Sequence, residues 1–385
     1  MTVFNWLTIL IVLLSIVMHG ERRQNWKFIL IACVMMYCVL GLRDVYSVGV
    51  DTTGPYVMRY DWVCAREWKN MPDLLDWLGL TGGGVDRTGH ERNIALDWVM
   101  KLFREATGGT YEGFIQFSSV FTMVAFGVFI YRFSPSPIQS ILMHFGLLFY
   151  NFHFSGLKQS LAMSVLLFSL AAIRDKRPVR FVMLVLLASM FHFPAIVFLP
   201  AYWIANMRVG RRYLIVLALA FLVTYLLRNQ LVDWMTDAYS TTINSGTARF
   251  IGNKVVVMIG ILVMAVVIRP PDPDDRIYSG FLMLLGVASV IQTFAGYNNT
   301  FERLADYYFQ TAVILIPMIF EPVKLKRQYL TSDSLALARQ VMPYLVCAFA
   351  IWRFWNVANS TSSHLSPYQF YFERKQSGWL WELFH

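Results

Sequence analysis

Apolar runs close to the length of a bilayer-spanning helix recur along the whole of this 385-residue sequence. A soluble domain covers its core with polar side chains, whereas here 57% of the residues are apolar and only 15% are charged. Within a bilayer, each such run must satisfy its backbone hydrogen bonds internally, which favours helices. We therefore predict an all-α fold, a polytopic membrane helical bundle that forms a single integral membrane domain over residues 1–385.

The apolar runs predict about twelve transmembrane helices, at residues 3–18, 27–42, 112–131, 138–152, 157–173, 179–191, 194–206, 213–228, 250–268, 277–296, 304–320 and 338–357. Two larger extramembrane parts remain, a loop at 43–110 and a C-terminal tail at 358–385. Lys and Arg lie mostly in the short loops of one side, which the positive-inside rule assigns to the cytoplasm. The large loop and the tail are then predicted to face outward. The net charge of +9 belongs to these loops, so no nucleic-acid partner is expected.

Residues 180–207 form one apolar stretch with basic clusters at both ends. If both ends are cytoplasmic, the stretch must turn back on itself at Phe191-His192-Phe193-Pro194, which places His192 at the outward tip. A single long helix, kinked at Pro194, is the alternative.

The large loop contains a candidate interfacial helix at residues 93–106. At helical spacing, Ile94, Trp98, Leu102 and Phe103 fall on one face, and Asp97, Lys101, Arg104 and Glu105 fall on the other. This pattern predicts a helix that lies on the outer leaflet, with packing as an ordinary loop helix as the alternative.

Six basic residues lie at the outward ends of predicted spans, where the charge rule disfavours them: Arg43, Lys158, Arg249, Lys254, Arg303 and Arg353. Singly, each is explained by snorkelling or by pairing with a neighbour such as Asp44, Glu302 or Asp306. Together they suggest an anionic ligand, a lipid phosphate or diphosphate, because arginine forks suit phosphate oxygens. The sequence contains no DxD cluster near these cations and no CxxC pair, so we predict no metal and no cofactor.

At these positions the sequence resembles the EpsG family of bacterial exopolysaccharide polymerases, which are related to the Wzy-type polymerases of capsule and O-antigen assembly. The matching segments are Gly41-Leu42-Arg43 with Gly49, Asp51, Thr52 and Tyr56; Lys158-Gln159-Ser160-Leu161-Ala162 with Phe191-His192; Glu302-Arg303-Leu304 with Tyr307 and Tyr308; and Ser366-Pro367-Tyr368. The resemblance covers nearly the whole chain.

The resemblance implies a membrane glycosyltransferase of the bacterial cytoplasmic (inner) membrane, with a multi-pass fold related to lipid-phosphosugar (GT-C-like) transferases. Undecaprenyl diphosphate-linked oligosaccharide would be both donor and acceptor, joined into polysaccharide on the outer side. Besides the lipid bilayer, a flippase and a chain-length regulator are the expected partners. A ligase or single-sugar transferase using the same lipid donor is the alternative enzyme, and a lipid-linked oligosaccharide flippase is the alternative of another class.

Such a transferase needs a base for the acceptor hydroxyl and cations for the departing diphosphate. The catalytic candidates are Asp51 and His192. The predicted diphosphate-binding residues are Arg43, Lys158, Arg303 and Arg249, and those for sugar or phosphate oxygens are Gln159, Tyr307, Tyr308, Tyr56 and His153. Two alternatives stay open: His192 hydrogen-bonds across the hairpin, and Asp51 caps the helix near Tyr56 or pairs with Arg43.

Overall fold

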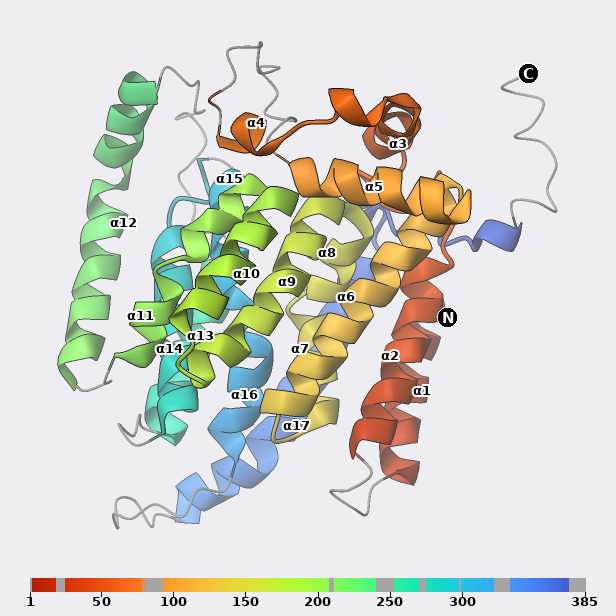
Figure 1. The fold of residues 1–385 in the computed structure, drawn as a ribbon. Coiled ribbons are helices and arrows are strands. Elements are labelled where there is room, and N and C mark those ends of the chain that lie inside the picture. The colour runs from red at the N-terminus through yellow and green to blue at the C-terminus, as the bar shows by residue number, and fades with distance from the viewer. Residues whose placement is uncertain are drawn as a thin grey trace. The chain divides into compact units, whose positions relative to one another are not determined.

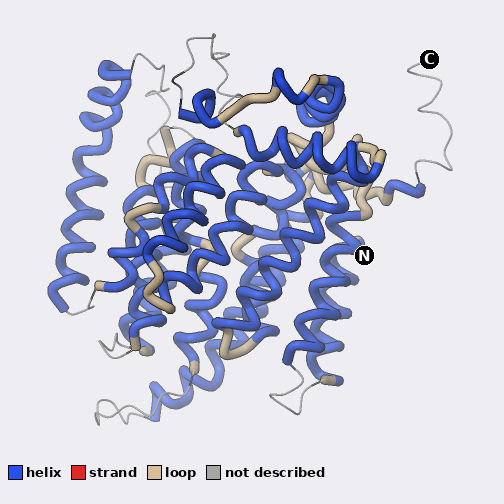
Figure 2. The backbone as a smooth tube through the Cα atoms, viewed as in Figure 1, coloured by secondary structure: helices blue, strands red, loops and turns tan. Residues whose placement is uncertain are grey.

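The computed structural model describes residues 2–18, 25–78, 80, 93–207, 211–239, 253–269, 275–297, 299–321 and 333–373. Within these ranges the chain is helical and contains no strand beyond an isolated bridge between Arg43 and Phe370, which confirms the all-α prediction. Figure 2 shows the helices joined by short loops. The chain divides into two compact units. Unit 1 comprises Met1–Ser169, Met183–Ile196 and Leu345–His385, and unit 2 comprises Leu170–Val182 and Val197–Tyr344.

Unit 1 is built on helices that run side by side and on a layer of short helices across one end of them (Figure 1). Its elements are α1 (Val3–Val17), α2 (Asn25–Gly41), α3 (Pro55–Ala65), η2 (Trp68–Asn70), α4 (Leu74–Leu78), α5 (Ile94–Thr107), α6 (Tyr111–Phe133), α7 (Pro137–Gly146), α8 (Phe149–Ser155), most of α9 (Leu157–Arg174), and the later parts of α10 (Pro178–Phe191) and α17 (Asp333–Ala358). α2 packs against α1 and α6, and α3 packs against α5. The large predicted loop is therefore a helical layer, called here the α3–α5 layer.

Unit 2 is built around α14 (Arg276–Gln292), which packs against its neighbours on several sides. Those neighbours are α11 (Ala201–Asn206), α12 (Arg211–Tyr239), α13 (Asn253–Ile268), α15 (Asn299–Phe309) and α16 (Ala312–Phe320). At one end of α14, Arg269 forms an ion pair with Asp275 and donates to the carbonyl of Met318. Asp275 in turn accepts from the backbone N–H of Tyr278 and so caps α14.

Three described helices are long and apolar enough to cross a membrane: Tyr111–Phe133, Leu157–Arg174 and Gln340–Ala358. Shorter apolar helices coincide with most of the other predicted spans. Two predicted spans are interrupted and are corrected here. Residues 138–152 divide into α7 and α8 at Leu148, which has a positive φ of 68°, and residues 304–320 divide into α15 and α16, where the Thr311 hydroxyl donates to the carbonyl of Tyr308. One break involves an unusual backbone conformation and the other a side-chain hydrogen bond to the backbone, and hydropathy registers neither.

The apolar stretch 180–207 folds back on itself. α10 ends one residue before His192, and η4 (Phe193–Phe198) and α11 follow. The ring of Phe181 lies 6.1 Å from that of Phe198 and 5.4 Å from that of Tyr202. In one continuous helix, residues 181 and 198 would be about 25 Å apart. The hairpin is therefore confirmed, and the single kinked helix is wrong.

Candidate functional site

Arg43 follows the end of α2 and is only 2% exposed. Its guanidinium donates to two backbone carbonyls, that of Leu40 at the end of α2 and that of Phe154 in the last turn of α8, the latter at 3.3 Å. The last carbonyls of a helix carry a partial negative charge and lack intrahelical donors. Burial lowers the pKa of Arg43 to about 10, so it stays charged at neutral pH. Two helix C-termini therefore stabilise this buried cation, which has no carboxylate partner among the described residues.

Three residues of the first family segment lie against the carbonyl of Phe154, and two of them donate to it. Besides Arg43, it accepts from the hydroxyl of Thr52 at 3.1 Å. Gly49 has a φ of +103°, and a Cβ placed there would lie 2.2 Å from the Phe154 carbonyl oxygen. Only glycine combines this backbone conformation with so close an approach. Arg43, Gly49 and Thr52 thus hold residues 47–54 as a defined turn against the end of α8.

Asp51 lies at the centre of this turn, and its side chain is half-buried. Its carboxylate makes no hydrogen bond or ion pair with any residue in the described part of the chain. α3 begins after Gly54 without a side-chain cap, and Arg43 donates to carbonyls, so neither alternative role for Asp51 is observed. The turn holds the backbone of Asp51 and leaves its carboxylate uncommitted.

Lys158, near the start of α9, is brought together with Tyr56 of α3. The ammonium nitrogen lies 5.7 Å from the centre of the Tyr56 ring, within the range of a cation–π contact. Lys158 is half-buried and Tyr56 is buried. These two predicted site residues, 102 positions apart in the sequence, therefore meet next to the turn that carries Asp51.

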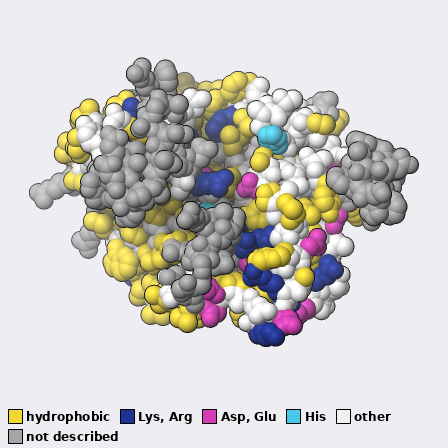
Figure 3. Space-filling view, turned by 90° about the horizontal axis from the view of Figure 1, so that it is seen from above, with side chains coloured by type: hydrophobic (Ala, Val, Ile, Leu, Met, Phe, Trp, Pro, Cys, Tyr) yellow, Lys and Arg dark blue, Asp and Glu magenta, His cyan; other side chains and the backbone are white. Residues whose placement is uncertain are grey.

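Asp97 of α5 lies at the centre of a second cluster of charges in the α3–α5 layer. Arg59 of α3 binds it through two hydrogen bonds of 2.7 Å, and the Asp97 side chain is only 3% exposed. Burial raises the pKa of Asp97, and the nearby charges of Arg59, Arg66 and Lys158 oppose that shift. Three cations, Arg59, Arg66 and Lys158, therefore lie near the Asp97 carboxylate. Figure 3 shows the face that carries this layer, where basic and acidic side chains lie among apolar ones.

The structure shows which residues of the two predicted faces of α5 are buried. Asp97 and Lys101 of the polar face are 2% and 4% exposed, whereas Trp98 and Leu102 of the apolar face are 42% and 52% exposed. Asp97 and Lys101 turn inward because Arg59 binds Asp97, and Lys101 donates to the carbonyl of Arg66 at 2.7 Å. Exposed Trp98 and Leu102 are what a helix lying on a lipid surface would present, and the predicted interfacial placement stays a prediction.

The tip of the hairpin contacts the α3–α5 layer. The backbone N–H of Phe193 donates to Asn93, the residue before α5, at 3.3 Å, and the ring of Phe193 lies 6.4 Å from that of Trp77 in α4. His192 is half-buried at this tip. His192, Asp51 and Lys158 thus all belong to unit 1. The α3–α5 layer contacts the hairpin tip through Asn93, contacts Lys158 through Tyr56, and follows the turn of Asp51 in the chain.

Two other candidates of unit 1 lie in its interior. His153 is 8% exposed and forms a hydrogen bond of 2.9 Å between its Nδ1 and the hydroxyl of Ser160, and its ring lies 5.2 Å from that of His144. Gln159 is 2% exposed. Their predicted contacts with sugar or phosphate oxygens stay predictions, and their burial favours a packing role.

The remaining candidates belong to unit 2. Arg303 is exposed on α15, while Tyr307 and Tyr308 of the same helix are buried. The Tyr308 hydroxyl donates to the carbonyl of Val197 at 2.6 Å, which ties α15 to the second arm of the hairpin. Arg249 lies outside the described residues. The sugar- or phosphate-binding roles of Tyr307 and Tyr308 stay predictions, and the structure shows the Tyr308 hydroxyl engaged in packing.

Sequence reasoning missed the Arg59–Asp97 pair, because 38 positions separate its members and no local pattern links them. It also missed the carbonyl of Phe154, since a backbone atom leaves no signal in the sequence. Among the described residues, no group of three or more His, Cys, Asp or Glu side chains is arranged to hold a metal ion.

Three described helices with the length and apolar composition of membrane spans, in a chain that is helical throughout its described ranges, indicate an all-helical membrane protein. The model of the EpsG family matches residues 26–370, nearly the whole chain, and this protein belongs to the EpsG family. The resemblance seen in the sequence is confirmed. Neither a curated protein nor a solved structure matches the chain.

Proposed function

We propose that this protein is a polysaccharide polymerase that joins undecaprenyl diphosphate-linked oligosaccharide repeats on the outer side of the bacterial cytoplasmic membrane. The observation that carries the proposal is the EpsG family match over residues 26–370, since that family is consistent with a polymerase-like glycosyltransferase. The distribution of Lys and Arg supports an outward-facing α3–α5 layer.

In the proposed reaction, the hydroxyl of an acceptor sugar attacks the anomeric carbon of the donor. The bond from that carbon to the lipid diphosphate breaks, and its electron pair leaves with the diphosphate. The hydroxyl proton passes to a base of the protein. A diphosphate is already a good leaving group, so the protein must supply a base and positive charge at the departing oxygens.

Asp51 is the proposed base. Three observations support this role: its turn is held by Arg43, Gly49 and Thr52, its side chain is half-buried, and its carboxylate is uncommitted within the described residues. Such a carboxylate can accept a proton without first breaking an ion pair. His192, at the hairpin tip on the same unit, is the proposed residue that orients the acceptor and the alternative base.

Lys158 is the proposed cation for the diphosphate, with Tyr56 beneath its ammonium group. Arg43 is proposed to act as a positioning residue, because its donors already meet the carbonyls of Leu40 and Phe154. Arg303 and Arg249 keep their predicted diphosphate roles in this proposal. The flippase that supplies the lipid-linked repeats and a chain-length regulator are its expected partners.

The proposal is tested by Asp51→Asn in a polymerisation assay with purified protein and lipid-linked repeats. Loss of the base should lower chain extension by about 100-fold or more, while the amount of folded protein stays unchanged. Asp61→Asn is the matched control, because Asp61 is an exposed acid of the same layer and should extend chains normally. Normal extension by Asp51→Asn together with a loss in His192→Gln would make His192 the base. Lipid transport across vesicles without extension by the unmodified protein would favour the flippase instead.

A further inference from the structure

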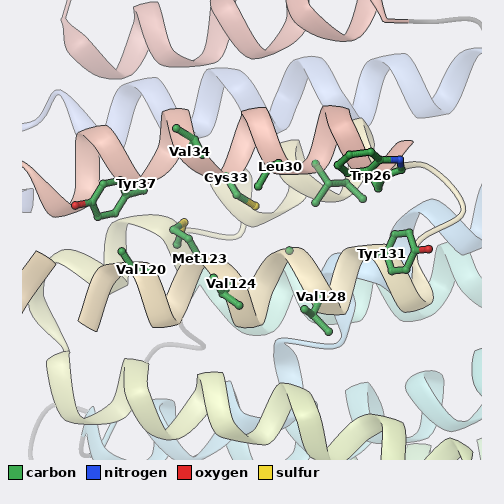
Figure 4. A pocket seen from close by; sticks show the side chains of 12 residues that line it. Trp26, Leu30, Cys33, Val34, Tyr37, Val120, Met123, Val124, Val128 and Tyr131 are labelled. Carbon is green, nitrogen blue, oxygen red and sulfur yellow. The ribbon is translucent and has the colours of Figure 1, made fainter. Parts of the chain in front are cut away.

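An apolar groove of about 370 Å³ lies between α2 and α6, both of unit 1. Figure 4 shows its lining side chains coming from these two helices, with Trp26 and Tyr131 at one end and Tyr37 and Val120 at the other. On α2 the groove extends from Trp26 to Tyr37, which corresponds to about 16 Å along a helix. The groove is long, narrow and apolar, which suits a hydrocarbon chain.

The close crossing of α2 and α6 shapes the floor of this groove. A Cβ at Gly127 of α6 would lie 3.2 Å from the Sγ of Cys33 of α2, so the glycine permits the close approach. Cys33 is 8% exposed, while Val34 and Val124 at the rim are 51% and 53% exposed. Apolar side chains this exposed are unfavourable in water and suited to contact with lipid.

Both walls of the groove lead to the turn that carries Asp51. On α2, the Tyr37 ring packs so closely against Gly41 that a Cβ there would meet it at 2.5 Å, and Gly41 immediately precedes the Leu42-Arg43 exit. On α6, the hydroxyl of Tyr111 at the first residue donates to the carbonyl of Thr52 at 3.1 Å. A chain lying in the groove would therefore have the end nearer Tyr37 directed towards this turn.

We infer that the groove binds the polyprenyl chain of the lipid-linked substrate and so directs its diphosphate to the turn beside Asp51 and Lys158. This inference rests on the proposed function, which supplies the lipid. A single long apolar chain matches a narrow apolar groove whose two walls lead to the turn that carries Asp51. A phospholipid acyl chain is the competing occupant, and competition between the two lipids separates them.

The first experiment uses the full-length protein in nanodiscs and a polyprenyl diphosphate with a photoreactive group within the chain. After irradiation, mass spectrometry of the digested protein locates the label. The label should lie on α2 and α6 near Cys33 or Val124, and unlabelled undecaprenyl diphosphate should compete for it. Competition by phosphatidylglycerol that is equally effective would overturn the inference, as would a label confined to other helices.

The second experiment fills the groove with Val124→Trp. Val124 is exposed at the rim, so the added ring meets the groove without entering a packed interior. The half-saturating concentration of lipid-linked substrate should rise about tenfold, as expected for the loss of about 1.4 kcal/mol of binding, and labelling should fall in parallel. Leu13→Trp is the matched control, because Leu13 is 51% exposed on α1 and does not line the groove.

The two experiments distinguish failure of this inference from failure of the proposed function. Normal polymerisation with a label away from α2 and α6, or with an unchanged half-saturating concentration in Val124→Trp, overturns the groove assignment and leaves the polymerase proposal standing. Specific labelling of the groove in a protein that never extends a chain supports the groove and overturns the polymerase proposal.

Discussion

Unit 1 and unit 2 each contain a cation that is balanced in a different way: Arg43 is buried, and the side chain of Lys254 is 17% exposed. In unit 1, Arg43 donates to the carbonyls that end α2 and α8. In unit 2, Lys254 at the start of α13 forms ion pairs with Glu302, at 3.1 Å, and with Asp306. Helix C-termini balance the first charge and carboxylates balance the second. Removing the cation should therefore have different consequences, since carboxylates are left charged whereas carbonyls are left only without a donor.

The largest expected effect is that of Lys254→Ala on stability. The side chain of Asp306 is 7% exposed, so the substitution leaves a carboxylate buried beside Glu302 with its cation removed. Breaking a buried pair from one side costs about 4 kcal/mol. The free energy of unfolding, measured by denaturant titration in detergent micelles, should fall by this amount.

The double variant Lys254→Met/Asp306→Leu sharpens this comparison. It removes both charges of the pair and replaces them with apolar side chains of similar size, which is often neutral for stability. We expect it to recover most of the loss seen in Lys254→Ala. A double variant as unstable as the single one would show that the ion pair does not account for the effect.

A smaller loss, about 2 kcal/mol, is expected for Arg43→Ala, because hydrogen bonds from a charged donor to two carbonyls are removed but no buried charge is left behind. Chain extension should fall as well, since the turn beside Asp51 loses one of its anchors. In Arg43→Ala, a second substitution that removes an acid should not restore stability. In Lys254→Ala, by contrast, removal of Asp306 should restore it. Thermal unfolding followed alongside polymer length measures both effects.

Arg353→Ala is the matched comparison for Arg43. Arg353 of α17 donates to the carbonyl of Gly146 at the end of α7. Its loss should destabilise the protein by about 1 kcal/mol. An Arg43→Ala protein with normal stability and no chain extension would instead mean that Arg43 contacts the substrate directly.

The smallest stability effect is expected for Arg303→Ala. Arg303 is exposed, and substitutions at such positions usually change the unfolding free energy by no more than about 0.5 kcal/mol. If its predicted diphosphate role is right, chain extension should nevertheless fall, and Arg303→Lys should retain part of it. Polymer of normal length from Arg303→Ala would remove Arg303 from the site.

Much of the fold was predictable, because hydropathy and loop charge act over short stretches of sequence. The hairpin at His192 is the clearest case: basic residues at both ends of one apolar stretch required a reversal, and the Phe181–Phe198 contact confirms it. The breaks at Leu148 and Thr311 were not predictable in this way, since they depend on backbone conformation and on local hydrogen bonds inside runs that remain apolar throughout.

The candidate site was likewise predictable in part. The family segments brought Arg43, Asp51, Tyr56 and Lys158 into one hypothesis, and the structure places Lys158 over Tyr56. The sequence could not separate Arg43, whose donors meet backbone carbonyls, from Asp51, whose carboxylate is uncommitted in the described residues. The partner of Asp97 on α5 was out of reach for a related reason: Arg59 belongs to a distant segment, and only packing reveals it.

The sequence by itself determined that this protein is an all-helical membrane protein of the EpsG family, because apolar runs and short motifs are carried by residues close together in the chain. Tertiary structure alone decided which charged side chains are used to hold the fold. A buried cation needs a counter-charge or a helix end within hydrogen-bond reach. For Arg43 one of these is the carbonyl of Phe154, 111 positions away, and for Lys254 they are acids 48 and 52 positions away.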